Sequence, residues 1–222
     1  ANGQEALDYL QDSFPDLIIS DVMMPVMDGI ELCRAVKDNI ETSHVPFLIL
    51  TSRDSLDAQL EGVGSGADFY FAKPISVDLL QLTIRNILDQ RQKLKERYAQ
   101  DQFAEARDMV HSAKDKAFMD QLLSIITEQL TNPDMDVDYI CQQAGMSRTK
   151  LYQKIKSITG QSIGEFVRSV RLRQAVKIMT EEDVPLTEVT YRVGIQTQSY
   201  FTKAFKKEFG KTPSQFLQEL KK

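Results

Sequence analysis

The chain has 222 residues, of which 42% are hydrophobic and 27% are charged, as in ordinary globular proteins. This length allows one large domain or two ordinary domains, each with its own core. No stretch approaches the roughly eighteen apolar residues of a membrane span and no signal peptide is visible, so we expect a cytoplasmic segment. Two cysteines, Cys33 and Cys141, are too few for a disulfide framework, which fits a reducing compartment.

Charge divides the chain into two unlike parts. Residues 1–90 carry a net charge of −10, whereas residues 91–222 carry +5 and residues 147–222 carry +8. We therefore expect only the second part to meet a polyanion. A basic face that is merely solvated is the alternative.

The acidic part alternates helical and strand patterns. We predict helices over 4–11, 29–39, 55–66 and 76–98, and strands over 16–20, 45–52 and 67–74. This order predicts a parallel sheet with helices on both faces. The apolar run in the first strand predicts burial on both of its faces.

A polar residue stands at the end of each predicted strand. Asp21 follows the first, Thr51 ends the second, and Lys73 ends the third. Because the carboxyl ends of parallel strands meet at one edge, where such sheets bind ligands, we expect these side chains to converge. A carboxylate, a hydroxyl and an ammonium together predict a site for a charged reacting group.

The stretches "SDVMMPVMDG", "LILTSR" and "GADFYFAKP" resemble the receiver domain of two-component response regulators. The resemblance implies a flavodoxin-like α/β fold with Asp21 as phosphoacceptor, and with Thr51 and Lys73 contacting the phosphoryl group. Tyr70 matches the aromatic switch position. Asp21 and the backbone carbonyl of Met23 would hold Mg²⁺, and a histidine kinase, in cis or in trans, would supply the phosphoryl group.

One part of the receiver pattern is missing. In that family the first strand ends in an acidic pair that binds Mg²⁺, whereas "ANGQEAL" matches the family just after its second strand. We therefore expect a fragment of a longer polypeptide, an incomplete receiver without its first two strands and first helix. Weak Mg²⁺ binding, slow or absent phosphorylation, and a bare strand edge that promotes self-association follow from this expectation.

A phosphatase of the haloacid dehalogenase type is a different reading of the same strand end. Such enzymes also use a strand-end Asp together with a Lys. They need a second Asp two residues later as general acid, and Met23 stands there. The sequence therefore favours a phosphoacceptor over an enzyme.

Residues 91–115 connect the two parts. The stretch up to residue 111 is polar and highly charged, without Pro or Gly. Either a helical extension or a disordered connector agrees with this composition.

The basic part contains an internal repeat. "GMSRTKLYQKIKSITGQSIGEF" (145–166) and "GIQTQSYFTKAFKKEFGKTPSQF" (194–216) align at an offset of 50 over most positions. Each copy reads as a helix, a Gly turn and a second helix, which is helix-turn-helix organisation. In the first copy we expect Ser147 to cap a helix that buries Leu151, Ile155 and Tyr152.

The second helix of each copy would enter the DNA major groove. The residues expected to contact DNA are Arg148, Thr149, Gln153, Lys156, Gln198, Ser199, Lys203, Lys206 and Lys207, with Lys154 and Thr202 also facing outward. Polar residues near each helix start would read bases, and the later lysines would meet phosphates. Duplex DNA, contacted in two adjacent major-groove segments, is thus the expected partner.

"MSRTKLYQKIKSITGQS" and "TEVTYRVGIQTQSYFTKAFKKEFGKTPSQF" are similar to the AraC-type DNA-binding domain. Thr190 and Ile195, where that family usually has Ala and Phe, are expected to face the core. The resulting plan is a partial receiver domain over 1–90, a helical linker over 91–115 and an all-α AraC-type domain with two helix-turn-helix motifs over 116–222.

This combination resembles the C-terminal part of hybrid two-component regulators of Bacteroidetes. There a sensor, a histidine kinase, a receiver and a regulator form one chain anchored in the inner membrane, so kinase activity would lie upstream and not in this chain. A free-standing cytoplasmic response regulator, or a receiver that serves only as an unphosphorylated dimerisation module, remains the alternative. In the active state we expect a homodimer.

Overall fold

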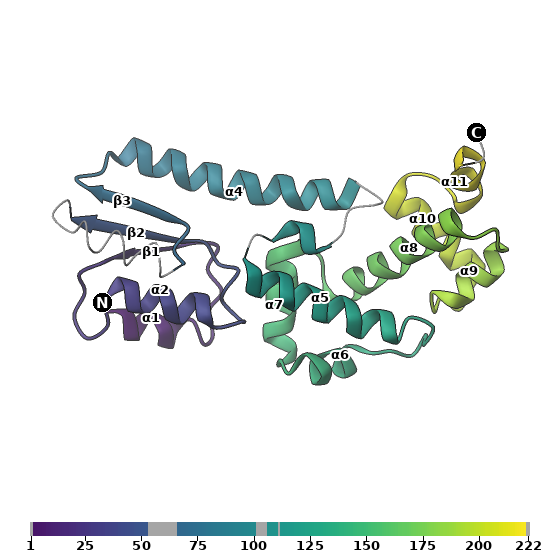
Figure 1. The fold of residues 1–222 in the computed structure, drawn as a ribbon, viewed down its shortest axis with the longest axis horizontal. Coiled ribbons are helices and arrows are strands. Elements are labelled where there is room, and N and C mark those ends of the chain that lie inside the picture. Colours follow the sequence, from purple (N-terminus) through teal and green to yellow (C-terminus); the bar gives the residue numbers. More distant parts are fainter. Residues whose placement is uncertain (1, 53–65, 101–105, 111, 221–222) are drawn as a thin grey trace. The chain divides into compact units, whose positions relative to one another are not determined.

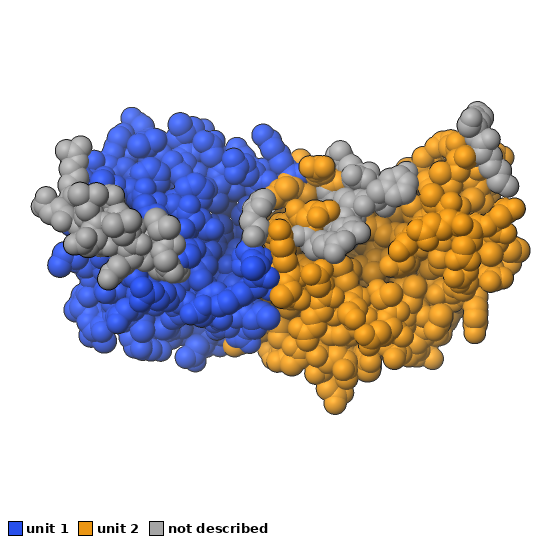
Figure 2. Space-filling view, viewed as in Figure 1, with its two compact units in different colours: residues 1–93, 112–115 blue, residues 94–111, 116–222 orange. Residues whose placement is uncertain are grey.

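The computed structural model describes residues 2–52, 66–100, 106–110 and 112–220 (Figure 1). The chain forms two compact units: unit 1 comprises residues 1–93 and 112–115, and unit 2 comprises residues 94–111 and 116–222 (Figure 2). Most of the helix predicted over 55–66 lies outside the described residues.

Unit 1 is built on a parallel sheet, as the alternating pattern predicted. Within the described residues its strands are β1 (Ile18–Asp21), β2 (Phe47–Ser52) and β3 (Phe69–Lys73), in the order β1-β2-β3. Its helices are α1 (Gly3–Tyr9), α2 (Gly29–Asp38) and α4, which begins at Val77 and ends at Gln100. Figure 1 shows α1 and α2 on one side of the sheet and α4 on the other.

The core of unit 1 gathers around the central strand. Phe47 and Ile49 of β2 are buried together with Cys33 and Val36 of α2. Burial of β1 on both faces, predicted from its apolar run, is wrong, because Ile19 is 42% exposed. In the described part of the sheet β1 lies at the edge and pairs with β2 alone, which leaves the face carrying Ile19 partly open.

Residues 91–100 continue α4 without a break, which is one of the two alternatives that the sequence left open for the connector. After the segment 101–105, a short 3-10 helix, η1, covers Ala106–Met109. Residues of α4 up to Lys93 belong to unit 1, and those from Leu94 onward belong to unit 2.

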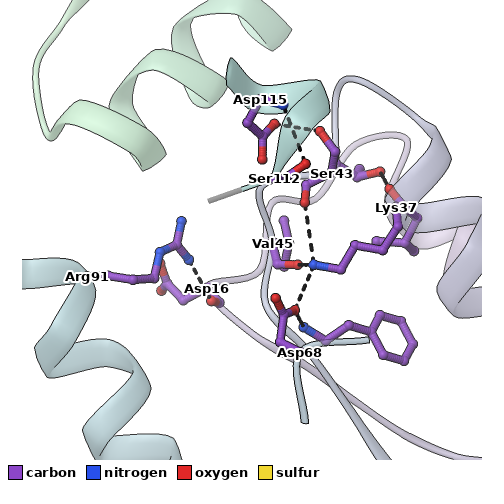
Figure 3. Close-up of polar contacts among 11 residues, drawn as sticks. Asp16, Lys37, Ser43, Val45, Asp68, Arg91, Ser112 and Asp115 are labelled. Carbon is purple, nitrogen blue, oxygen red and sulfur yellow. Dashed lines mark hydrogen bonds and ion pairs between the residues drawn. The ribbon is translucent and has the colours of Figure 1, made fainter. Parts of the chain in front are cut away.

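Residues 112–115 belong to unit 1 through polar contacts to the loop between α2 and β2 (Figure 3). The Ser43 hydroxyl donates a hydrogen bond of 2.6 Å to the Asp115 carboxylate, and both residues are buried. On α2, the Lys37 ammonium lies 2.7 Å from the Asp68 carboxylate. Because a buried carboxylate needs such donors, this contact fixes where α5 starts.

Unit 2 is helical throughout its described residues. Its helices are α5 (Ala113–Glu128, whose first three residues count with unit 1), α6 (Val137–Ala144), α7 (Arg148–Thr159), α8 (Ile163–Glu181), α9 (Leu186–Arg192), α10 (Gln198–Phe209) and α11 (Pro213–Leu220). In Figure 1, α8 runs from the group formed by α5, α6 and α7 towards the group formed by α9, α10 and α11.

Two hydrophobic cores share α8. The first contains Phe118 of α5, Leu151 of α7 and Phe166 of α8. The second contains Leu172 of α8 and an aromatic group in which the Phe201 and Phe205 rings of α10 lie 5.7 Å apart. The first half of α8 therefore completes one helix-turn-helix motif and its second half completes the other.

The turn of each motif has the chemistry that the repeat predicted. Gly145 ends α6 with φ +65°, and the Ser147 hydroxyl accepts the N–H of Lys150 at the start of α7. In the second copy Gly194 also has φ +65°, and Thr197 caps α10. Glycine suits these positions because it adopts positive φ without the steric cost that a Cβ imposes.

The two core positions that depart from the AraC-type pattern are buried, as predicted. Ile195 packs in the second core. The Thr190 hydroxyl donates a hydrogen bond of 2.6 Å to the carbonyl of Leu186, one turn earlier in α9. The buried hydroxyl is thereby satisfied inside the helix.

Candidate functional sites

The structure brings the three strand-end residues to one edge of the sheet. Asp21 ends β1, Thr51 lies next to the end of β2, and Lys73 ends β3 opposite Ser52. The Lys73 ammonium forms an ion pair with the Asp21 carboxylate. Thr51 is buried at the same end of the sheet. A carboxylate, a cation and a hydroxyl thus lie at one edge of the sheet. Their joint action on a phosphoryl group stays a prediction.

The start of α2 holds the segment that follows Asp21. The Asp28 carboxylate accepts two backbone N–H groups of the first turn of α2, and Glu31 accepts the N–H of Asp28 in return, which forms a capping box. At Gly29 a Cβ would lie 2.0 Å from the backbone oxygen of Asp21. Only glycine therefore lets α2 begin against the end of β1, which accounts for the Asp-Gly pair in the motif.

The loop before that pair contains one strained residue. Val26 has φ +70° and its side chain is 84% exposed. A β-branched residue in the left-handed region is disfavoured by contact of its Cβ with the backbone. The loop beside the strand end therefore stores backbone strain at a position that glycine would relieve.

Hydrogen bonding controls the charge of Asp21. The hydrogen bond from Lys73 lowers the pKa of this carboxyl below its usual value, and the N–H of Met23, 3.3 Å from Oδ1, acts in the same direction. The carboxylate is ionised at neutral pH, which is the form that can attack a phosphoryl donor.

The same edge of the sheet is where the sequence predicted Mg²⁺. Among the described residues there is no group of three or more His, Cys, Asp or Glu side chains placed to hold a metal. This edge offers the Asp21 carboxylate and the backbone carbonyl of Met23, which are the oxygen donors that Mg²⁺ prefers. Since that carboxylate is paired with Lys73, the remaining donor set is small.

Tyr70 lies in the middle of β3, opposite Ile49 of β2. Its half-buried side chain packs against the core of unit 1. Its assignment as a switch residue stays a prediction.

In unit 2, α7 and α10 occupy equivalent places in the two motifs, and we call them the reading helices. Their predicted DNA contacts are exposed at Arg148, Thr149, Lys156, Gln198, Ser199, Lys203, Lys206 and Lys207, and half-buried at Gln153. Together they form a polar, basic surface along both helices.

Two predictions about α7 are wrong. Lys154, expected to face outward, is fully buried, and its ammonium lies 4.8 Å from the centre of the Phe118 ring of α5. Tyr152, expected in the core, is 38% exposed. The buried stripe of α7 passes through Leu151 and Ile155, and position 154 lies on it whereas position 152 does not.

Tyr152 is a surface residue that the sequence reading missed. It lines a shallow hollow together with Arg148 and Thr149, next to the first residues of α8. An exposed aromatic side chain among the predicted DNA contacts adds apolar surface to the start of the first reading helix.

Two protein families match the chain. The response regulator receiver domain matches residues 1–85, and a helix-turn-helix domain matches residues 140–219. The chain joins a response regulator receiver domain to an AraC-type helix-turn-helix domain. The receiver domain thus contains the Asp21 site, and the helix-turn-helix domain contains most of unit 2.

Similar proteins contain one or both of these domains. Histidine kinase P4 of Formosa agariphila is 39% identical over 215 residues, which is 97% of this chain and 16% of that protein. Response regulator MprA of Mycolicibacterium vanbaalenii is 39% identical over 87 residues, which is 39% of this chain and 37% of that protein. The chain therefore spans much less than half the length of these relatives.

Solved structures match the helix-turn-helix half as well. The C-terminal domain of AraT, a response regulator from Geobacillus stearothermophilus, is 25% identical with a TM-score of 0.42. The match covers 46% of this chain and 84% of that one.

The chain is thus similar to response regulators and to a histidine kinase, in each case over part of that protein's length. Receiver domains are phosphorylated by histidine kinases with the help of Mg²⁺, and helix-turn-helix domains bind DNA. None of the helices in the described ranges combines the length and the apolar character needed to cross a bilayer.

Proposed function

We propose that Asp21 accepts a phosphoryl group from a histidine kinase and that this modification controls DNA binding by the reading helices. The ion pair between Lys73 and Asp21, beside Thr51, is the observation that carries the proposal. A carboxylate oxygen of Asp21 would attack phosphorus as the P–N bond of a phosphohistidine breaks, and the imidazole would leave with a proton. The Lys73 ammonium would then pair with the phosphoryl oxygens, to which Thr51 would donate a hydrogen bond.

We propose further that the chain is a segment of a hybrid regulator with histidine kinase activity elsewhere in the same polypeptide. Its similarity to Histidine kinase P4 over nearly its whole length supports this proposal. A free-standing response regulator, to which the MprA match corresponds, is the alternative. In both cases the receiver and helix-turn-helix domains would work on the cytoplasmic side, where the DNA is, and Mg²⁺ would assist phosphorylation in a complete receiver.

The phosphoacceptor is tested by mass spectrometry on the whole polypeptide with a small phosphodonor and Mg²⁺. We expect one acid-labile phosphoryl group, which Asp21→Asn abolishes. Asp28→Asn is the matched control, because it makes the same exchange at the cap of α2 and leaves the acceptor in place. A phosphoryl group that persists in Asp21→Asn would refute the assignment.

For DNA, we propose that Thr149, Gln153, Gln198, Ser199 and Lys203 read bases and that Lys156, Lys206 and Lys207 meet phosphates. Arg148, the first residue of α7, would also contact DNA. The base-reading group lies nearer the start of each helix, which is the end that a helix-turn-helix motif presents to base edges. The two reading helices belong to repeat copies that α8 connects. Both would therefore face the same side of the duplex, about one turn of DNA, roughly 34 Å, apart.

Substitutions in the base-reading group and in the phosphate-contacting group should affect DNA binding differently. A titration of operator and scrambled DNA at several salt concentrations measures this difference. Lys203→Ala should cost about 1–3 kcal/mol at the operator and relax base preference. Lys207→Ala should weaken both DNAs alike and lower the salt slope by about one unit. Lys177→Ala, an exposed lysine on α8 outside the reading helices, is the control and should change neither. The reverse pattern for Lys203 and Lys207 would show that the groups are exchanged.

We propose that the phosphorylated protein is a homodimer. Two linked copies would contact DNA over twice the surface, so dimerisation would raise the affinity for the operator. Analytical ultracentrifugation with and without phosphodonor tests this. A dimer that forms equally well in Asp21→Asn would instead indicate a receiver that serves only as a dimerisation module.

A further inference from the structure

Arg171 lies where the two cores of unit 2 meet. Val170, the residue before it in α8, belongs to the first core, and Leu172, the residue after it, belongs to the second. Its side chain therefore leaves α8 at the junction between the two helix-turn-helix motifs.

The guanidinium of Arg171 joins the turn of the second motif to the segment that leads into the first motif. Nη1 donates a hydrogen bond of 2.6 Å to the carbonyl of Gly194, in the turn between α9 and α10. Nη2 donates one of 2.6 Å to the carbonyl of Asn132, between α5 and α6. A planar guanidinium presents two N–H groups in a fixed fork, so it can define the direction of both contacts at once.

The two joined segments are also in direct backbone contact. A Cβ at Gly194 would lie 2.2 Å from the carbonyl oxygen of Leu130, and Leu130 packs against the second core. Burial lowers the pKa of Arg171, and the nearby Tyr200 of α10 opposes that effect. An arginine stays charged in proteins, so both hydrogen bonds are charge-assisted.

The other arginine of this part of α8 makes a different kind of contact. Arg173 lies 3.1 Å from Glu208 of α10, so it ties α8 to a helix of the same motif. Apolar packing along α8 is non-directional, and it leaves the angle between the motifs less defined than hydrogen bonds do. Within the described residues, Arg171 is thus well placed to hold one motif against the other.

We infer that Arg171 is a positioning residue for DNA recognition: it fixes α10 relative to α7 and so sets the spacing between the two DNA segments that the protein reads together. This inference rests on the proposed function, because it requires both reading helices to contact DNA. It assigns the choice of operator spacing to a residue that need not touch DNA itself.

The test uses the full chain and an operator selected from random duplex DNA, with one or two base pairs inserted between the two contacted segments. Each inserted base pair moves the segments apart by roughly 3.4 Å, so the unaltered protein should lose affinity roughly 10- to 100-fold. Arg171→Met should bind the original operator more weakly. Its affinities for the original operator and for the operators with inserted base pairs should differ by less than about threefold. Arg171→Lys keeps the charge but not the fork, and it should restore only part of the contrast.

Arg192→Met is the matched control, because Arg192 makes an ion pair with Glu182 near the surface of the second motif and does not join the two motifs. It should keep the spacing preference of the unaltered protein. If Arg171→Met also keeps that preference, the inference is overturned.

A second measurement needs no DNA. Spin labels at Gln142 of α6 and Glu188 of α9, both exposed, report the distance between the motifs after the native cysteines are replaced. The distance distribution should broaden in Arg171→Met and not in Arg192→Met, and Arg171→Lys serves if the Met variant does not fold. An unchanged distribution would overturn the inference, whereas the absence of any preferred DNA sequence would refute the proposed function.

Discussion

Alanine in place of Gly194 should destabilise the protein far more than alanine in place of Gly145, although both glycines have φ +65°. The shared part of the cost is the left-handed backbone, about 1–2 kcal/mol for a residue with a Cβ. At Gly145 a Cβ would meet nothing within 4 Å, so this part is the whole cost. At Gly194 the Cβ would lie 2.2 Å from the Leu130 oxygen, and the turn must move.

That movement adds an overpacking cost of about 1–3 kcal/mol, and it pulls the Gly194 carbonyl away from Arg171. We therefore expect a total loss of about 2–5 kcal/mol for Gly194→Ala against about 1–2 kcal/mol for Gly145→Ala. Urea unfolding of each variant, followed by far-UV circular dichroism, measures the loss in the free energy of unfolding. Equal losses, or a larger loss at Gly145, would show that the close approach of the turn to Leu130 is not a constraint.

Three further outcomes follow from the Asp21 site. Lys73→Met should raise the pKa of Asp21 toward the usual value of an Asp side chain, because it removes the hydrogen bond that lowers it. Carbon NMR of the carboxyl as a function of pH measures this. Since the pKa is depressed in the folded protein, the Lys73 contact stabilises the fold above about pH 4, and this contribution disappears as pH falls through the folded pKa. An unchanged pKa in Lys73→Met would contradict the ion pair. Val26→Gly should raise the free energy of unfolding by about 1 kcal/mol, because glycine accepts φ +70° without strain, and a loss of stability in urea would show that the loop needs the Val side chain. Mg²⁺ titration of this chain should give weak binding, because the edge supplies few oxygen donors, and micromolar affinity would show that other groups complete the site.

The sequence predicts well what local chemistry decides. The strand ends at Asp21, Thr51 and Lys73 converge because parallel strands share an edge, and the caps at Gly145 and Ser147 follow from backbone conformation. The caps depend on a few neighbouring residues, and the convergence of the strand ends depends on the parallel direction of the strands.

The reversed roles of Lys154 and Tyr152 show where residue type misled the sequence reading. Position 154 lies three residues after Leu151 and one before Ile155, on the buried stripe, but its charge led to the prediction that it faces outward. Its burial depends on Phe118, 36 residues earlier in a different helix. The role of Arg171 is still harder to predict from the sequence. It depends on the carbonyls of residues 132 and 194, which are far apart in the sequence, lying close together in space.

Sharing α8 between two cores has a consequence for how this part of the chain folds. Neither motif can bury its apolar residues without its half of α8, so the motifs should gain and lose structure in one cooperative step. A proline in the middle of α8 would then uncouple the two motifs, because each core uses a different half of the helix. In the unaltered protein, a form that keeps one motif folded while the other is unfolded should be scarcely populated.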